Sequence, residues 1–128
     1  MKKGVYCLLL YLKNYTKIKV RDKEALFPKG YYCYVGSALN NLQKRIERHK
    51  RKIKKKHWHI DYFLEKARIL EVKTILTNEK KECWLNNKIR SLGSKTVMKK
   101  FGSTDCKCET HLHYFQKNPS KKLDEVFK

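Results

Sequence analysis

The chain has 128 residues, of which 41% are hydrophobic and 34% charged; this composition excludes a disordered chain, and the length suits a single domain. Lysine and arginine number 32 against 12 aspartates and glutamates, which gives a formal net charge of +20. Such an excess attracts polyanions, so we expect nucleic acid as the partner, ahead of an anionic membrane surface.

Residues 4–12, GVYCLLLYL, are almost uninterruptedly apolar, and this pattern predicts a strand buried on both faces. Two lysines precede the segment as in a signal peptide, but no small-residue cleavage site follows, and the segment is too short to span a bilayer. We therefore expect the protein to stay in the cytoplasm. Its five cysteines, an odd number, argue against a disulfide framework.

The next segments indicate two more strands and a helix. Residues 15–20, YTKIKV, alternate in polarity and predict a strand that forms a hairpin with the first. Residues 31–36, YYCYVG, predict an aromatic strand that ends at Gly36. A helix is then expected from Asn41 to about Ile53, because apolar residues and one histidine recur at helical spacing: Leu42, Ile46, His49 and Ile53.

The second half of the chain continues with helix, strand and helix. Residues 57–67 predict a second helix, 68–77 a strand, and 79–93 a third helix that ends at Gly93. Residues 101–115 are expected to be a loop followed by a short strand. The predicted class is α+β, with a small antiparallel sheet covered by helices in a domain of residues 1–115 and a polar tail of residues 116–128.

Several polar side chains in the predicted helices and strands are candidate catalytic or metal-binding residues. Arg45 and His49 are four residues apart and therefore share one helix face beside the apolar stripe. Glu82 begins a buried stripe, where a carboxylate is costly unless it is paired or binds a cation. The helix dipole offers a purely structural reason for Glu82, since negative charge is favoured in a first turn. Tyr6 and Tyr34 lie in two different predicted strands.

These residues, in this order, resemble the GIY-YIG nuclease superfamily. The matching features are GVY at 4–6, YVG at 34–36, Arg45 with His49, and the later Glu82. The segments HWHIDY and FGSTDCKCETHL look more like a small prokaryotic branch of uncharacterised GIY-YIG domains. The resemblance implies a GIY-YIG-like fold, in which a three-stranded antiparallel sheet is flanked by helices. It also implies a metal-dependent endonuclease that hydrolyses DNA phosphodiester bonds, in DNA repair or recombination.

The resemblance also implies a role for each residue. Glu82 would be the only protein ligand of Mg²⁺ or Mn²⁺, and Arg45 would clamp the scissile phosphate. Tyr6 would position and deprotonate the attacking water, Tyr34 would share its hydrogen-bond network, and His49 would accept a proton or orient Tyr6. The family's later Asn has no match here, because the corresponding region holds residues 103–105, Ser-Thr-Asp.

The basic run from Lys44 to Lys56 is the expected DNA-binding surface. It continues the helix of Arg45, so it can follow the phosphate backbone without reading sequence. The residues assigned to nucleic-acid binding are Lys44, Arg48, Lys50, Arg51, Lys52, Lys54, Lys55 and Lys56.

Cys106, Cys108 and His111 form a tentative second metal site, for Zn²⁺. His113 is a further ligand of suitable type, and His57, His59 and Cys83 could join them. Their spacing is not a common zinc pattern, so we favour small buried cysteines with a hydrogen-bonded histidine. In HWHID, we favour a structural role in which a histidine pairs with Asp61 to fasten the second helix.

Two other functions compete with the nuclease. One is a non-catalytic DNA- or RNA-binding module of the same fold, and the other is a structural protein whose charge serves RNA contacts. Retention of Glu82 favours the nuclease, because a protein that only binds nucleic acid has no need for that carboxylate.

Overall fold

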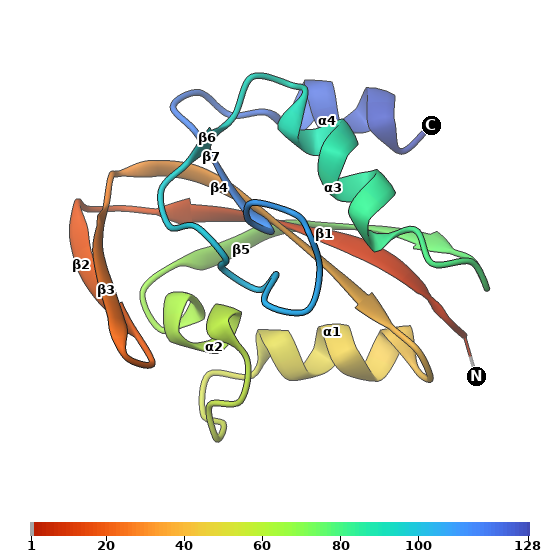
Figure 1. Cartoon of the computed structure of the whole chain (residues 1–128), viewed down its shortest axis with the longest axis horizontal. Coiled ribbons are helices and arrows are strands. Elements are labelled where there is room, and N and C mark those ends of the chain that lie inside the picture. Colours follow the sequence, from red (N-terminus) through yellow and green to blue (C-terminus); the bar gives the residue numbers. More distant parts are fainter. Residues whose placement is uncertain (1) are drawn as a thin grey trace.

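A five-stranded antiparallel sheet forms the centre of the protein in a computed structural model that describes residues 2–128 (Figure 1). Its strand order is β5-β1-β4-β7-β6, so the sheet has five strands instead of the three expected. With four helices within residues 2–128, the class is mixed α+β, as predicted. The strands of this sheet are β1 (Gly4–Leu12), β4 (Gly30–Ala38), β5 (Arg68–Leu76), β6 (Lys95–Thr96) and β7 (Leu112–Phe115).

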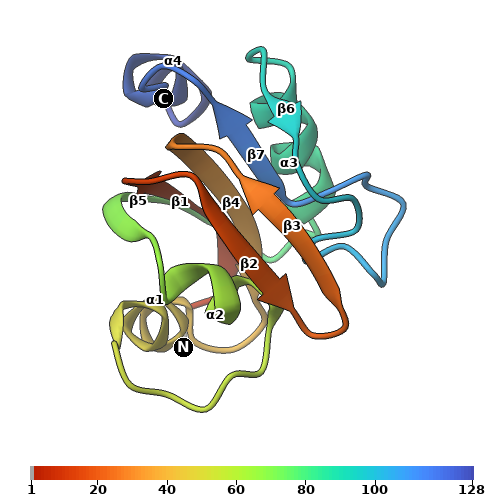
Figure 2. The same ribbon diagram turned by 90° about the vertical axis from the view of Figure 1, so that its left-hand side faces the viewer.

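Helices cover both faces of the sheet (Figures 1 and 2). On one face lie α1 (Leu42–Lys50) and α2 (His59–Leu64), and on the other lie α3 (Glu82–Arg90) and α4 (Ser120–Val126). Side chains of β1 alternate between two hydrophobic cores: Tyr6, Leu8 and Leu10 face α1 and α2, whereas Val5, Cys7 and Leu9 face α3 and α4. The prediction that residues 4–12 form a strand buried on both faces is therefore confirmed.

The predicted hairpin between residues 4–12 and 15–20 is wrong. The strand β2 (Thr16–Val20) instead pairs with β3 (Lys23–Phe27) as a separate two-stranded ribbon. The reason is that β1 is paired along both of its edges, with β4 and with β5, which leaves no edge free for β2. The tight turn of the ribbon contains Arg21 at a φ of 58°, a backbone conformation that an arginine in the sequence does not predict.

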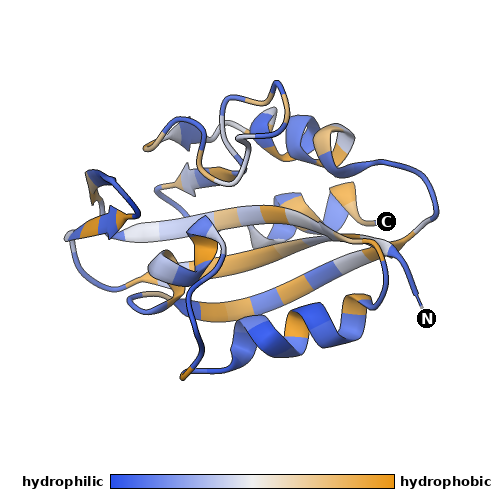
Figure 3. Ribbon diagram, turned by 60° about the horizontal axis from the view of Figure 1, so that its bottom comes forward, coloured by the Kyte–Doolittle hydropathy of each residue, from blue (hydrophilic) through white to orange (hydrophobic). Residues whose placement is uncertain are grey.

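The helix α1 is shorter than expected, because it ends at Lys50 and not near Ile53. Ile53 lies in the following loop and is 94% exposed. Lys54 folds back from that loop and donates hydrogen bonds to the carbonyl oxygens of Arg48 and His49, at 3.1 and 2.8 Å. It thus satisfies orphan carbonyl groups at the helix end. In Figure 3, α1 is mostly hydrophilic with apolar bands, as a helix packed by one stripe should be.

The C-terminal segment, expected to be a polar tail of residues 116–128, contains α4. Leu123 of this helix is fully buried, and Val126 and Phe127 pack against the same core as α3. Over residues 2–128 we find no helix with the length and apolar character needed to cross a membrane.

Candidate functional site

Four side chains that are far apart in the sequence line one cavity of about 690 Å³. Tyr6 comes from β1, Tyr34 from β4, Arg45 from α1 and Glu82 from the first residue of α3. Basic residues from the β2–β3 ribbon and from the loop after β6 also line the wall: Arg21, Lys23, Lys99 and Lys100. The cavity wall also carries the carboxylates of Asp22 and Asp105 besides that of Glu82, but the lysines and arginines outnumber them, which suits an anionic ligand.

Tyr6 occupies its place because the opposite strand leaves room for it. Tyr6 pairs with Gly36 across β1 and β4, and a Cβ at position 36 would collide with the Tyr6 phenol ring. The Tyr6 hydroxyl lies 2.7 Å from Nε2 of His49. His49 is buried behind Tyr6 and does not line the cavity, so it can act on a ligand only through Tyr6.

Burial determines the protonation states of Tyr6, Tyr34 and His49. It raises the pKa of Tyr6 and of Tyr34 well above the usual value, although the nearby positive charge of Arg45 opposes part of this effect. Burial also lowers the pKa of His49 to about 3. At neutral pH the two phenols are therefore protonated and the imidazole is neutral, so Tyr6 and His49 share one hydrogen bond whose donor is set by the His49 tautomer.

Arg45 is held in position by two contacts. Its Nη1 donates a hydrogen bond to the carbonyl oxygen of Ser37, at 2.8 Å. Its guanidinium lies over the ring of Trp58, 4.2 Å from the ring centroid. Trp58 also lines the cavity, and sequence reasoning missed it. The basic residues around Trp58 are the signal that could have suggested stacking with an arginine.

Arg48 differs from the rest of the basic set, because its guanidinium is already engaged. It makes two hydrogen bonds with the buried carboxylate of Asp61, at 3.0 and 2.9 Å. Asp61 also accepts hydrogen bonds from the backbone N–H groups of His57 and Trp58. Asp61 thus fastens α2 as expected, but its partners are Arg48 and backbone groups and not a histidine ring. The ring of His59 instead accepts a hydrogen bond from the N–H of Gly102.

The remaining basic residues divide by exposure. Lys54 caps α1, and Lys56 forms an ion pair with Glu65 at 3.0 Å. The others are exposed on α1 and in the loop that follows, as the predicted nucleic-acid surface requires: Lys44, Lys50, Arg51, Lys52 and Lys55.

Glu82 stands between the cavity and a second group of side chains. Its carboxylate Oε2 lies 3.5 Å from Nδ1 of His111. Asn86, one turn further along α3, is turned away to Thr110 and His113, to which it is hydrogen-bonded at 2.9 and 2.7 Å. Asp105, from the region that holds Ser-Thr-Asp, does line the cavity.

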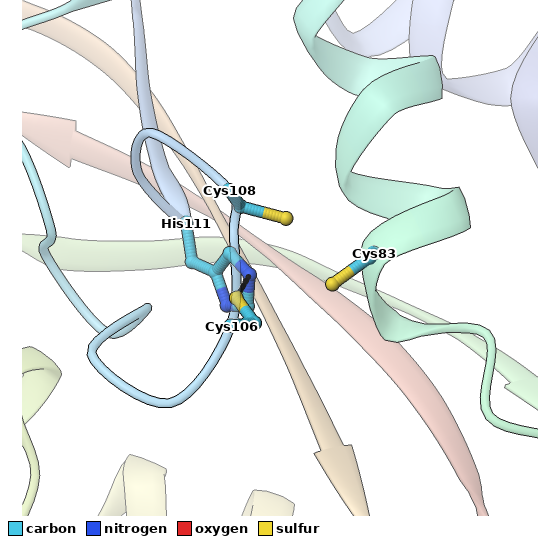
Figure 4. Close-up of side chains that lie close together, drawn as sticks. All are labelled: Cys83, Cys106, Cys108 and His111. Carbon is cyan, nitrogen blue, oxygen red and sulfur yellow. Dashed lines mark hydrogen bonds between the residues drawn. The ribbon is translucent and has the colours of Figure 1, made fainter.

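The second group consists of Cys83, Cys106, Cys108 and His111 (Figure 4). One ligand atom from each residue lies within 4.8 Å of all the others, so this cluster could hold a metal ion. A hydrogen bond with Cys108, together with burial, raises the pKa of the Cys83 thiol to about 12. The sequence prediction named three of these residues as the tentative site, and the structure adds Cys83 from α3. The two other cysteines, Cys7 and Cys33, are buried in the core beneath α3.

The fold and the site define a basic, mixed α+β domain that carries a polar cavity beside a cysteine–histidine cluster. The chain belongs to the family described as "Domain of unknown function DUF123", which it matches over residues 5–128. Searches of curated proteins and of solved structures found no match.

Proposed function

We propose that the protein is a metal-dependent endonuclease of the GIY-YIG type, which hydrolyses DNA phosphodiester bonds in repair or recombination. The observation that carries this proposal is the meeting of Tyr6, Tyr34, Arg45 and Glu82 around one cavity. The strands β5, β1 and β4 give further support, because they form a three-stranded antiparallel unit within the larger sheet. Such a unit, flanked by helices, is what the resemblance to GIY-YIG nucleases implies.

The donor groups of the cavity suit a Mg²⁺ or Mn²⁺ ion at Glu82. The Glu82 side chain is 28% exposed, so its carboxylate is open to water as well as to the cavity. Mg²⁺ keeps several of its waters and binds through one or two carboxylates, and a cavity of about 690 Å³ has room for a hydrated ion. When bound, the metal ion would neutralise charge on the phosphate and lower the pKa of a bound water.

Arg45 is suited to hold the scissile phosphate. Its guanidinium is anchored by Ser37 and Trp58 before any ligand arrives, so little side-chain freedom is lost when a phosphate binds. A guanidinium offers a planar set of donors that matches phosphate oxygens. Charge that develops on those oxygens during hydrolysis would be stabilised by the same contact.

The pair of Tyr6 and His49 orients the attacking water in this mechanism. A phenol whose pKa is raised is a poor general base, and so is an imidazole whose pKa is lowered to about 3. In the tautomer that leaves Nε2 of His49 unprotonated, Tyr6 donates a hydrogen bond to Nε2, and a lone pair of the Tyr6 oxygen then faces the cavity as an acceptor for water. Of the two roles considered for His49, orientation of Tyr6 is therefore favoured over acceptance of a proton.

One contact favours a second candidate, a DNA- or RNA-binding module without catalysis. The approach of Glu82 to His111, at 3.5 Å, gives the carboxylate a structural partner and removes the need for a catalytic metal. In that case the exposed lysines would bind nucleic acid, and the cavity would hold a phosphate without cutting the chain.

Cleavage assays on labelled duplex, single-stranded, flap and branched DNA, with Mg²⁺, Mn²⁺ or EDTA, distinguish the two candidates. We expect metal-dependent cutting by the wild type, and losses of about 10²–10³-fold for Arg45→Lys and at least as much for Glu82→Gln. Glu65→Gln, which removes a carboxylate outside the cavity, is the matched control and should cut normally. Equal, salt-sensitive binding by all four proteins without cutting would overturn the nuclease and leave the binding module.

A further inference from the structure

The cluster of Cys83, Cys106, Cys108 and His111 has the chemistry and the spacing of a metal centre. Three thiol sulfurs and one imidazole nitrogen lie within 4.8 Å of one another. Bonds from zinc of about 2.3 Å to sulfur and about 2.0 Å to nitrogen would place tetrahedral ligand atoms about 3.5–3.8 Å apart. The pair of His111 Nε2 and Cys106 Sγ is already 3.5 Å apart. Side-chain shifts of about 1 Å would close the remaining gaps.

We propose that these four residues bind one zinc ion in a closed, structural site that joins the start of α3 to the loop before β7. Three thiolates and an imidazole form a soft donor set, which selects zinc over the hard Mg²⁺ ion. Four protein ligands leave no open position for water, and this is the pattern of structural rather than catalytic zinc sites. The zinc site does not depend on whether the protein is a nuclease.

His111 is oriented as a zinc-bound histidine would be. Nε2 faces the thiol of Cys106, while Nδ1 faces the Glu82 carboxylate at 3.5 Å. A histidine ligand of zinc commonly donates its second ring N–H to a carboxylate, which fixes the ring and its tautomer. The backbone of His111 is also fixed, because its N–H donates to Phe101 and its carbonyl accepts from Val35.

The loop gives a physical reason for a metal ion. Residues 97–111, between β6 and β7, contain no helix or strand. A loop of this length keeps a fixed conformation only if further interactions stabilise it. Lys100 supplies part of it by donating hydrogen bonds to the carbonyl oxygens of Cys106 and Cys108, at 3.0 and 3.4 Å. A zinc ion would tie the same loop to α3 through Cys83 and would add the energy of metal binding to folding.

The position of Cys83 links this site to the cavity. Glu82 and Cys83 are the first two residues of α3, so a metal ion on Cys83 holds the turn from which the Glu82 carboxylate reaches the cavity. Cys106 directly follows Asp105, whose side chain lines the cavity, so a metal ion on Cys106 would also hold this part of the loop. Zinc would therefore set the shape of one side of the candidate active site without touching a substrate.

Metal analysis of the purified protein tests the proposal. We expect about one zinc per chain in the wild type, and nearly none in Cys83→Ala and Cys108→Ala. Cys7→Ala is the matched control, since it removes a thiol from the core outside the cluster and should keep the zinc. Glu82→Gln should retain zinc at saturation but bind it about 10–100-fold more weakly, because only the outer partner of His111 is changed.

Cobalt provides a readout that does not require any variant to fold. Co²⁺ added to zinc-free wild type should give the strong visible bands of a tetrahedral site together with thiolate-to-metal charge transfer. A wild-type protein that holds no zinc and gives no thiolate band with Co²⁺ would overturn the proposal. Iron bound in place of zinc, or a disulfide between two of the three cysteines, would overturn it equally. None of these measurements depends on nuclease activity, so failure of the zinc proposal can be distinguished from failure of the nuclease proposal.

Discussion

Tyr6 and Gly36 face each other across β1 and β4, and the Tyr6 ring fills the space that a Cβ of residue 36 would occupy. This close approach allows the Tyr6 hydroxyl to reach His49, at 2.7 Å. The two short motifs that contain these residues are therefore coupled sterically: the glycine of the second makes room for the tyrosine of the first.

We expect Gly36→Ala to destabilise the protein by about 1–3 kcal/mol, because the added methyl group must displace Tyr6 within a packed core. Alanine would otherwise be expected to favour an extended strand by a few tenths of a kcal/mol or more. Urea denaturation measures the change. In a Tyr6→Val background the clash is absent, so the same glycine substitution should be close to neutral; an equal cost in both backgrounds would exclude steric coupling.

The burial of His49 predicts a stability that falls in acid. Its pKa is lowered to about 3, below the unfolded value near ~6.5, so between these values the unfolded chain binds a proton that the folded chain does not. The free energy of unfolding is therefore unaffected by protonation of His49 above about pH 6.5. As pH falls from there toward 3, protonation of the unfolded chain lowers the free energy of unfolding by up to about 1.4 kcal/mol per pH unit.

His49→Gln removes this titration while it keeps an acceptor for Tyr6, so its free energy of unfolding should depend less on pH between 4 and 6.5. Urea denaturation at several pH values measures the slopes, and the difference between two proteins cancels any contribution from metal loss. His57→Gln, at an exposed site, should keep the slope of the wild type. A slope for His49→Gln as steep as that of the wild type would contradict the assignment.

Local patterns in the sequence were enough to predict β1, β4, β5, α2 and α3, because each has an uninterrupted apolar run or a stripe at the right period. The strand over residues 15–20 was also predicted and is β2, but β3 and its pairing with β2 were missed for two reasons. The β2–β3 turn uses Arg21 in a conformation that usually indicates glycine or asparagine, and the occupied edges of β1 are a property of the whole sheet.

The candidate site was predictable as a set of residue types, but its geometry was not. Tyr6, Tyr34, Arg45 and Glu82 were named from their order in the chain, while their shared cavity depends on how α3 packs against the sheet. The place of Cys83 beside the loop cysteines has the same origin, since no local spacing connects it to them. The hydrogen bonds between Arg48 and Asp61 could not be predicted either, because the sequence of a basic run does not show which of its side chains are paired with a carboxylate.

The pair of Arg48 and Asp61 should be a main support of α2. The Asp61 side chain is fully buried and accepts from the Arg48 guanidinium and from two backbone N–H groups. Burial alone would raise the pKa of Asp61, but these hydrogen bonds lower it to about 2. Stability from this group is therefore present above the unfolded pKa, near ~3.9, and is lost as pH falls toward 2.

Asp61→Asn should lower the free energy of unfolding at pH 7 by about 3 kcal/mol, since it leaves a partly buried guanidinium without its counter-charge. Thermal and urea denaturation measure the loss. Glu65→Gln breaks the more exposed ion pair with Lys56 and should change stability by no more than about 0.5 kcal/mol. Similar effects of the two substitutions would show that burial does not decide the strength of these pairs.

The exposed lysines around α1 should determine how DNA affinity depends on salt. If Lys44 and Lys52 each contact a phosphate, replacing both by alanine should reduce the slope of log K against log salt by about 1.8 for duplex DNA. Fluorescence anisotropy over a series of salt concentrations measures this slope. The weakening should be similar for unrelated sequences, because phosphate contacts carry no base information.

The matched control replaces Lys117 and Lys121, two exposed lysines of the C-terminal segment that packs on the opposite face of the sheet. It removes the same charge as the first double variant, so an effect of net charge alone should change the affinity of both proteins equally. If α1 forms a defined DNA-binding surface, only the Lys44 and Lys52 variant should show the reduced slope. An equal change of slope in the two double variants would mean that the charge of +20 acts as a diffuse field and that α1 has no special place in binding.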